Sequence, residues 1–169
     1  LYEAAENLTD RLAALRLLVH HRLPGSEEAL ASFYDRFRDN PLVLDKWFAV
    51  QATTPDRDTL RRVEALSAHP SFSFKNPNRV YALIRTFAAA NPVGFNRPDG
   101  AAYRHLARVI GDLDSQNPSV AARLATAFRS FRMLEPERRA HAERALRQIA
   151  GSERLSRDVG DIVTRTLEG

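Results

Sequence analysis

The chain has 169 residues, of which 44% are hydrophobic and 27% charged, so it can bury the core of one ordinary globular domain without disulfides. It contains no cysteine, which excludes disulfide frameworks, zinc ribbons and thiol nucleophiles, and no apolar run approaches the roughly 18 residues that a membrane span needs. The formal net charge is +4, and the basic residues, almost all arginine, are dispersed among 21 acidic residues rather than gathered in a block.

Amphipathic helices account for most of the chain. Apolar residues recur at positions i, i+3, i+4 and i+7, which places them in one stripe along an α-helix. In chain order the stripes cover residues 30–37, 80–87, 106–113, 124–131 and 142–149, and a further stripe begins at residue 159. The segment 42–50 is apolar almost all round, so we expect a central, buried helix there. No stretch alternates with a period of two, so no sheet is predicted.

Asn-Pro pairs mark the starts of several of these helices. They begin at Asn40, Asn76, Asn91 and Asn117. Asparagine is a good N-cap, and proline is favoured at the first helical position because its missing N–H would have no partner there. Three of the pairs directly precede an apolar segment and are interpreted as helix starts. The pair at Asn91 is instead expected to open a loop that runs through residues 94–100.

Short connections predict that neighbouring helices pack as antiparallel pairs. The starts at residues 40, 76 and 117 recur at a spacing close to the roughly 40 residues of a two-helix HEAT or armadillo unit. The prediction is an all-α chain of about nine helices. It forms a single domain over residues 1–169, a right-handed superhelix of the armadillo/HEAT type. A compact helical bundle is the alternative, because the units share little sequence.

The residues themselves offer no catalytic or metal site. None of the five histidines belongs to an H-E-x-x-H motif, and no two lie four residues apart on one helix face. The sequence also lacks a glycine-rich phosphate loop and a G-x-S-x-G nucleophile elbow. Acidic pairs such as Glu27-Glu28 fall at expected helix starts, where they favour the helix dipole. No catalytic residue, metal ligand or cofactor site is therefore assigned to this chain.

Four segments carry motifs of a known family, at residues 7–15, 37–48, 69–84 and 112–124. The last two read H-P-S-F-S-F-K-N-P-N-R-V-Y-A-L-I and D-L-D-S-Q-N-P-S-V-A-A-R-L. Together they resemble the C-terminal part of bacterial aminopeptidase N, a zinc-dependent alanyl aminopeptidase of the gluzincin type. The resemblance runs nearly end to end with the motifs in the same order, and it implies an all-helical armadillo/HEAT-like superhelix.

The resemblance also implies a role within a larger enzyme. The family binds zinc through an H-E-x-x-H helix and a downstream glutamate in a catalytic domain upstream of this region. Because that motif is absent here, we expect the chain alone to be inactive, with no cofactor of its own and zinc only in the parent. It would contact the catalytic domain of the same polypeptide and wall a cavity that admits peptides. The start at Leu1 rather than Met suggests a piece of a longer protein, expected to be cytoplasmic and without a membrane partner.

Two helices carry the cavity-lining residues that the resemblance implies. Arg123 corresponds to an arginine that faces the cavity in the family, and Ser119 lies four residues earlier on the same helix face. An arginine there can fork onto a peptide carboxylate or carbonyl, while Ser119 is shorter than the glutamine that relatives often carry. Arg79, Tyr81 and Arg85 follow the Asn-Pro pair at residue 76. Tyr81 stands where some relatives have arginine, and Arg85 lies one turn later on the same face. Plain surface positions are the alternative for both helices.

Two functions of other classes stay open beside this one. A free-standing helical-repeat module would use an arginine-rich concave surface to bind nucleic acid or protein. Nucleic acid is the less expected partner, because the arginines alternate with acids and phosphate binding needs them on one face. The chain could also be a scaffold for subunit contact.

Overall fold

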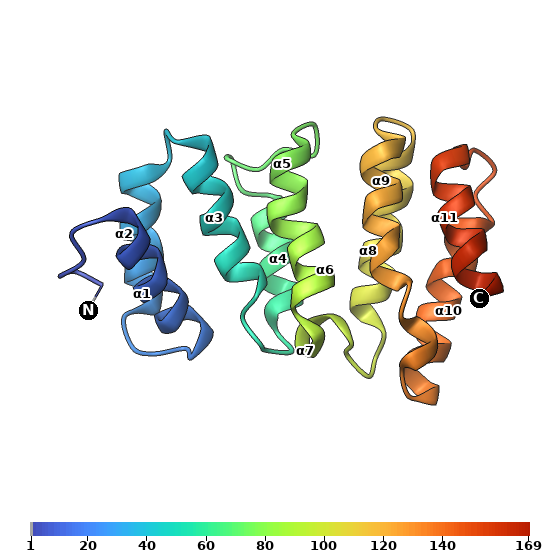
Figure 1. The fold of residues 1–169 in the computed structure, drawn as a ribbon, viewed down its shortest axis with the longest axis horizontal. Helices are drawn as coiled ribbons and strands as arrows, with labels where there is room; N and C mark the ends of the chain where they lie inside the picture. The colour runs from blue at the N-terminus through green and yellow to red at the C-terminus, as the bar shows by residue number, and fades with distance from the viewer. Residues whose placement is uncertain (1) are drawn as a thin grey trace. The chain divides into compact units, whose positions relative to one another are not determined.

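The computed structural model describes residues 2–169, and every regular element in that part of the chain is helical (Figure 1). Contacts group the chain into two compact units, unit 1 (Leu1–Asn91) and unit 2 (Pro92–Gly169). Nine helices of eight or more residues lie within residues 2–169 when three consecutive segments over 77–90 are taken as one. The predicted all-α fold of about nine helices is therefore confirmed. The single domain and the handedness of the superhelix stay predictions.

Unit 1 is arranged around α3 (Pro41–Ala52). Its neighbours are α1 (Leu8–His20), α2 (Ser26–Phe37), α4 (Thr59–Ser67) and a helix made of α5 (Pro77–Val80), η1 (Tyr81–Arg85) and α6 (Thr86–Ala90). Trp47 on α3 is buried, and its Nε1 donates to the carbonyl of Leu30 on α2 at 2.9 Å. This confirms the central, buried helix with one correction. Leu42 is 71% exposed, because it lies on the side of the first turn opposite the buried Leu44.

Unit 2 is built from four longer helices and three short ones. α8 (Ala101–Asp114) packs against α9 (Pro118–Ala125) and α10 (Pro136–Ala150), while α11 (Arg157–Glu168) packs against α9 and α10. The one-turn α7 (Pro92–Phe95) precedes α8, and two 3-10 turns, η2 (Thr126–Phe128) and η3 (Phe131–Met133), connect α9 to α10. The stripe at 124–131 therefore does not belong to one α-helix. Phe128 and Phe131 still reach the core, which these tighter turns allow.

Three of the Asn-Pro pairs act as helix starts, as predicted. The Oδ1 atoms of Asn40, Asn76 and Asn117 accept hydrogen bonds from the backbone N–H three residues later, at 3.2 to 3.3 Å. In each case proline occupies the first helical position. The sequence signal therefore located the first residues of α3, α5 and α9.

The fourth pair plays a different part. Asn91 is 1% exposed, and its Nδ2 donates to the carbonyls of Ala52 and Thr54 at 2.9 and 2.6 Å. These bonds satisfy carbonyls at the C-terminal end of α3. The prediction that Asn91 opens a loop was wrong for the first four residues, because Pro92–Phe95 forms the one-turn helix α7. An irregular segment then leads to Gly100.

The helix over residues 77–90 contains a π-helical turn in its middle. The backbone N–H of Thr86 bonds to the carbonyl of Tyr81, five residues earlier, and the Thr86 hydroxyl donates to the same carbonyl at 3.0 Å. Such turns are rare and often occur at functional sites. Periodicity did not predict this one, because Leu83 and Ile84 are buried as they would be in a regular helix.

None of the helices described in residues 2–169 is both long and apolar enough to cross a bilayer.

Asp114 joins the end of α8 to the start of α11 within unit 2. Its carboxylate accepts hydrogen bonds from the backbone N–H of Ser156, at 2.7 Å, and from the Ser156 hydroxyl. Ser156 is the N-cap of α11, with its Oγ accepting from the N–H of Val159 at 3.3 Å. Asp114 is 5% exposed and Ser156 is half-buried, so this small network is partly buried and contacts two helices at once.

We expect Asp114→Ala to lower the free energy of unfolding by about 1–3 kcal/mol, because it removes the acceptor of two half-buried donors of Ser156 and weakens the cap of α11. Asp112→Ala, at an exposed position of the same helix, is the matched control and should change stability by less than about 0.5 kcal/mol. Urea unfolding of the 169-residue chain measures both. Equal losses in the two variants would contradict the role given to Asp114.

Candidate functional site

Ser119 and Arg123 lie together on the exposed side of α9. The opposite side of this helix is buried and carries Val120, Ala121 and Leu124. Since Asn117 caps the helix, the positions of Ser119 and Arg123 around its axis follow from their distance from the cap. Four residues apart, they bring a hydroxyl and a guanidinium to one face, and both groups donate hydrogen bonds to carbonyl or carboxylate oxygens.

The three candidate residues of the helix over 77–90 differ in environment. Arg85 is exposed, Tyr81 is half-buried, and Arg79 is 6% exposed. The structure therefore presents Arg85 and part of Tyr81 to solvent on unit 1, while Arg79 lies in the interior. Ser119 and Arg123 belong to unit 2, so the candidates form two separate groups.

Arg79 is anchored to α3. Its Nη1 lies 2.8 Å from Oδ1 of Asp45, and its Cζ lies 5.1 Å from the centroid of the Phe48 ring. The two charged atoms are close but not aligned as a hydrogen bond. Burial raises the pKa of Asp45, and the positive charge of Arg79 opposes that rise. The pair therefore connects the start of α5 to α3, and its Coulomb attraction is offset by the desolvation of the two charged groups.

An aromatic group surrounds His69 on unit 1. The His69 ring centroid lies 5.1 Å from that of Tyr34, 5.5 Å from that of Trp47 and 6.0 Å from that of Phe48. The backbone N–H of Ser71 donates to His69 Nδ1 at 3.1 Å, and the Tyr34 and Ser71 hydroxyls are 2.7 Å apart. Burial lowers the pKa of His69, which favours the neutral ring. These contacts make His69 a structural residue of the segment before α5.

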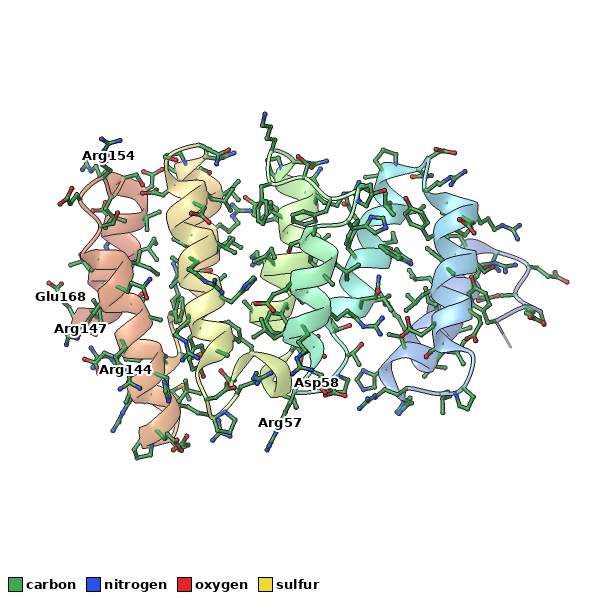
Figure 2. The ribbon with its side chains drawn as sticks, turned by 180° about the vertical axis from the view of Figure 1, so that it is seen from behind. Arg57, Asp58, Arg144, Arg147, Arg154 and Glu168 are labelled. Carbon is green, nitrogen blue, oxygen red and sulfur yellow. The ribbon has the colours of Figure 1, made fainter. Side chains whose placement is uncertain are left out.

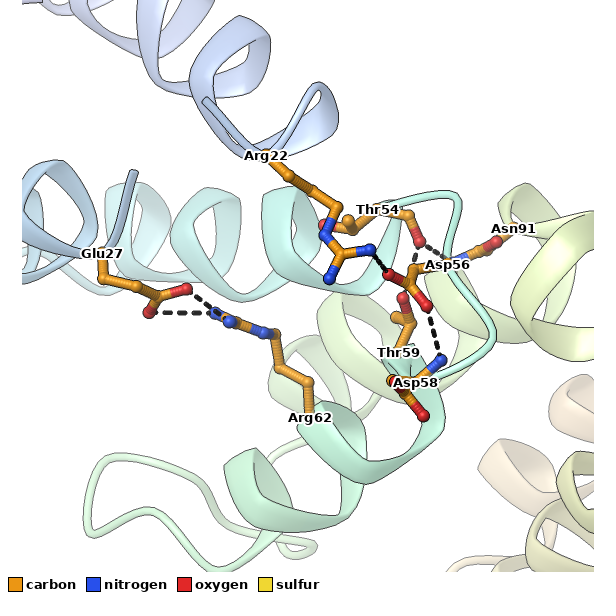
Figure 3. A network of polar contacts seen from close by, with 8 residues as sticks. All are labelled: Arg22, Glu27, Thr54, Asp56, Asp58, Thr59, Arg62 and Asn91. Atoms are coloured by element: carbon orange, nitrogen blue, oxygen red, sulfur yellow. Dashed lines mark hydrogen bonds and ion pairs between the residues drawn. The ribbon is translucent and has the colours of Figure 1, made fainter. Parts of the chain in front are cut away.

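A cavity of about 680 Å³ lies within unit 1, where α1, α2, α3 and α4 meet. Figure 3 shows two ion pairs beside it, from Arg22 to Asp56 and from Arg62 to Glu27. Arg62 also donates to Oε1 of Gln51 at 3.2 Å. Because these charges satisfy one another, the cavity carries little uncompensated charge, and we assign it a structural role. The sequence did not predict this cavity, because it depends on contacts between distant residues such as Glu27 and Arg62, which are 35 residues apart.

The described residues do not fit a zinc site. Among residues 2–169, no three histidine, aspartate or glutamate side chains come close enough to hold a metal ion. The zinc that the resemblance assigns to the parent enzyme therefore has no ligand set here.

Comparison with known proteins identifies one family. The family model described as "Domain of unknown function (DUF3458_C) ARM repeats" matches residues 1–168. This match confirms the armadillo-type architecture rather than the alternative of a compact bundle.

Individual relatives agree with the resemblance to aminopeptidases. The chain is 39% identical to aminopeptidase N of Escherichia coli K12 and 42% identical to that of Caulobacter vibrioides, over 98% of this chain and 19% of each relative. The crystal structure of Legionella pneumophila aminopeptidase A in complex with aspartic acid is similar with a TM-score of 0.92 and 32% identity, over 99% of this chain and 20% of that one. The chain thus spans about a fifth of the length of these proteins.

We expect Arg79→Met to lower the free energy of unfolding by about 3 kcal/mol at neutral pH, because it leaves Asp45 charged and without its partner. Losing the cation raises the pKa of Asp45 further. A raised pKa in the folded state gives stability that is present at low pH and is lost as pH rises through that pKa. The loss should therefore be smaller near about pH 5 than near about pH 8.

The matched control is Arg85→Met, at an exposed position of the same helix, which should change stability by less than about 0.5 kcal/mol at both pH values. Urea unfolding at each pH measures the difference. A loss for Arg79→Met that is the same at both pH values would refute the coupling to Asp45.

Proposed function

Because the chain belongs to the DUF3458_C family of ARM-repeat domains, we propose that it is the non-catalytic C-terminal helical domain of a zinc aminopeptidase. The observation that carries the proposal is similarity to aminopeptidase N over 98% of this chain. The matched region is only 19% of each relative, which leaves ample length for a catalytic domain in the parent. The parent would remove N-terminal residues from peptides.

The proposed task of this domain is to wall the active-site cavity and limit substrate access. Its partner is the catalytic domain of the same polypeptide, which would bind zinc through an H-E-x-x-H helix and a glutamate. When bound, that zinc supplies a polarised water as nucleophile. This chain contributes shape and hydrogen-bond donors instead.

Arg123 is the residue that we propose contacts the peptide. Its exposure, its place on a capped helix and the neighbouring hydroxyl of Ser119 support this role. Tyr81 and Arg85 of unit 1 are proposed as further residues that line the cavity of the parent. Arg79 would act as a positioning residue, because its contact with Asp45 holds the helix that carries Tyr81 and Arg85.

The two other function classes have weaker support. The relatives named above are aminopeptidases, which favours the peptidase domain over a free-standing nucleic-acid module or a plain scaffold.

The isolated 169-residue chain should release no amino acid from a chromogenic alanyl substrate, with or without added zinc, because it carries no H-E-x-x-H motif. The full-length parent, assayed in parallel, should turn the substrate over and lose activity with a chelator. Zinc-dependent turnover by the isolated chain would refute the proposal.

In the full-length parent, Arg123→Ala should raise KM for peptides by about 5- to 30-fold, because a charged hydrogen-bond donor to substrate is worth about 1–2 kcal/mol. The kcat should change little, since the contact is made in the ground state as well as in the transition state. Arg157→Ala is the matched control, because Arg157 has a 91% exposed side chain on α11 of the same unit. An unchanged KM across several peptides would remove Arg123 from the site.

A further inference from the structure

Five arginines gather around two adjoining cavities at one end of unit 2. Arg132, Arg139 and Arg147 line the first cavity, of about 420 Å³, which η3, α10 and α11 form. Arg129, Arg132 and Arg165 line the second, of about 350 Å³. Arg132 belongs to both cavities and joins them. We call these residues the arginine surface: Arg129, Arg132, Arg139, Arg147 and Arg165.

The charge of this surface is strongly unbalanced. Glu143 is the one acidic side chain among the residues that line the two cavities, so five arginines and one glutamate give a net charge of +4. The formal net charge of the whole chain is also +4. The residues that line the two cavities therefore carry a local positive excess, although along the sequence the arginines are dispersed among acids. A local field of one sign attracts counter-ions of the opposite sign.

Three of the five guanidinium groups are available to a ligand. The side chains of Arg129, Arg139 and Arg165 make no ion pair or hydrogen bond with any residue in the described part of the chain, 2–169. Of the five, Arg147 alone has an acidic partner among residues 2–169: Oε1 of Glu143 lies 3.1 Å from its Nε and 2.6 Å from its Nη2. Figure 2 shows Arg147 projecting outward from α10 at this end of the unit.

Arg132 is held in place between the two cavities. Its Nη2 donates to the carbonyl of Leu167 at the end of α11, and its Cζ lies 5.3 Å from the centroid of the Phe131 ring. An arginine that is already oriented loses less conformational entropy when it binds a ligand. Its remaining N–H groups can donate to an anion in either cavity, because a guanidinium carries five donors in one plane.

We propose that the arginine surface binds a small polyphosphate anion, with one phosphate group in each cavity and Arg132 between them. Guanidinium groups match phosphate oxygens with paired, charge-assisted hydrogen bonds, and a phosphate carries more charge than a carboxylate of similar size. The two cavities have volumes typical of small-molecule sites. The cavity of unit 1 differs, since its three arginines are matched by three carboxylates, and two of them, Arg22 and Arg62, form ion pairs. This binding site is independent of the proposed peptidase role.

Calorimetric titration of the full-length protein with sodium tripolyphosphate tests the proposal. At about 50 mM salt we expect saturable binding that weakens as salt is added. Arg139→Gln/Arg165→Gln should weaken the binding at least about tenfold, because it removes one free guanidinium from each cavity. Neither side chain has a partner in the structure, so the fold should survive, and an unchanged unfolding midpoint verifies this.

The matched control is Arg154→Gln/Arg157→Gln, which removes the same charge from exposed positions of unit 2 outside the two cavities. It should change the affinity by less than about twofold. Absence of saturable binding would overturn the proposal, as would equal weakening in both double variants. Tight binding of single-stranded RNA that tripolyphosphate does not displace would overturn it in favour of a nucleic-acid surface.

Discussion

The asparagine caps at the starts of α3, α5 and α9 are the constraint on which the candidate site depends. A helix start fixes the rotation of every residue that follows, so it decides which side chains face inward and which face solvent. From Asn76 the chain turns Arg79 into the interior and leaves Arg85 exposed. From Asn117 it buries Leu124 and exposes the side bearing Arg123. If either helix began one residue earlier or later, the side chains of Arg85 or Arg123 would be rotated by about 100° around the helix axis.

Charged side chains are paired beside the cavity of unit 1 but, within residues 2–169, are largely unpaired at one end of unit 2. In unit 1, Glu27 and Arg62 meet although they are 35 residues apart, because stacked helical units bring residues about one repeat apart into contact. Those charges neutralise one another. At the end of unit 2, two adjoining cavities are lined by five arginines and a single glutamate. The first arrangement stabilises the contact between helices, whereas the second leaves a field directed at solvent.

Two buried charged side chains hold helices in place, one in each unit. Asp114 anchors α11 and Arg79 anchors α5, and both are nearly inaccessible to solvent. Their loss would therefore act on the stability and placement of these helices.

Periodicity and capping residues alone determined the helical class, three of the helix starts and the buried position of most of α3, because these signals are local in sequence. The motifs likewise identified the family before any coordinates. Only the tertiary structure decided that Arg79 pairs with Asp45, that Tyr81–Arg85 forms a π-helical turn, and that five dispersed arginines share one surface. Each of these depends on which helix faces lie against each other, and that choice is made by packing across dozens of residues rather than by any single segment.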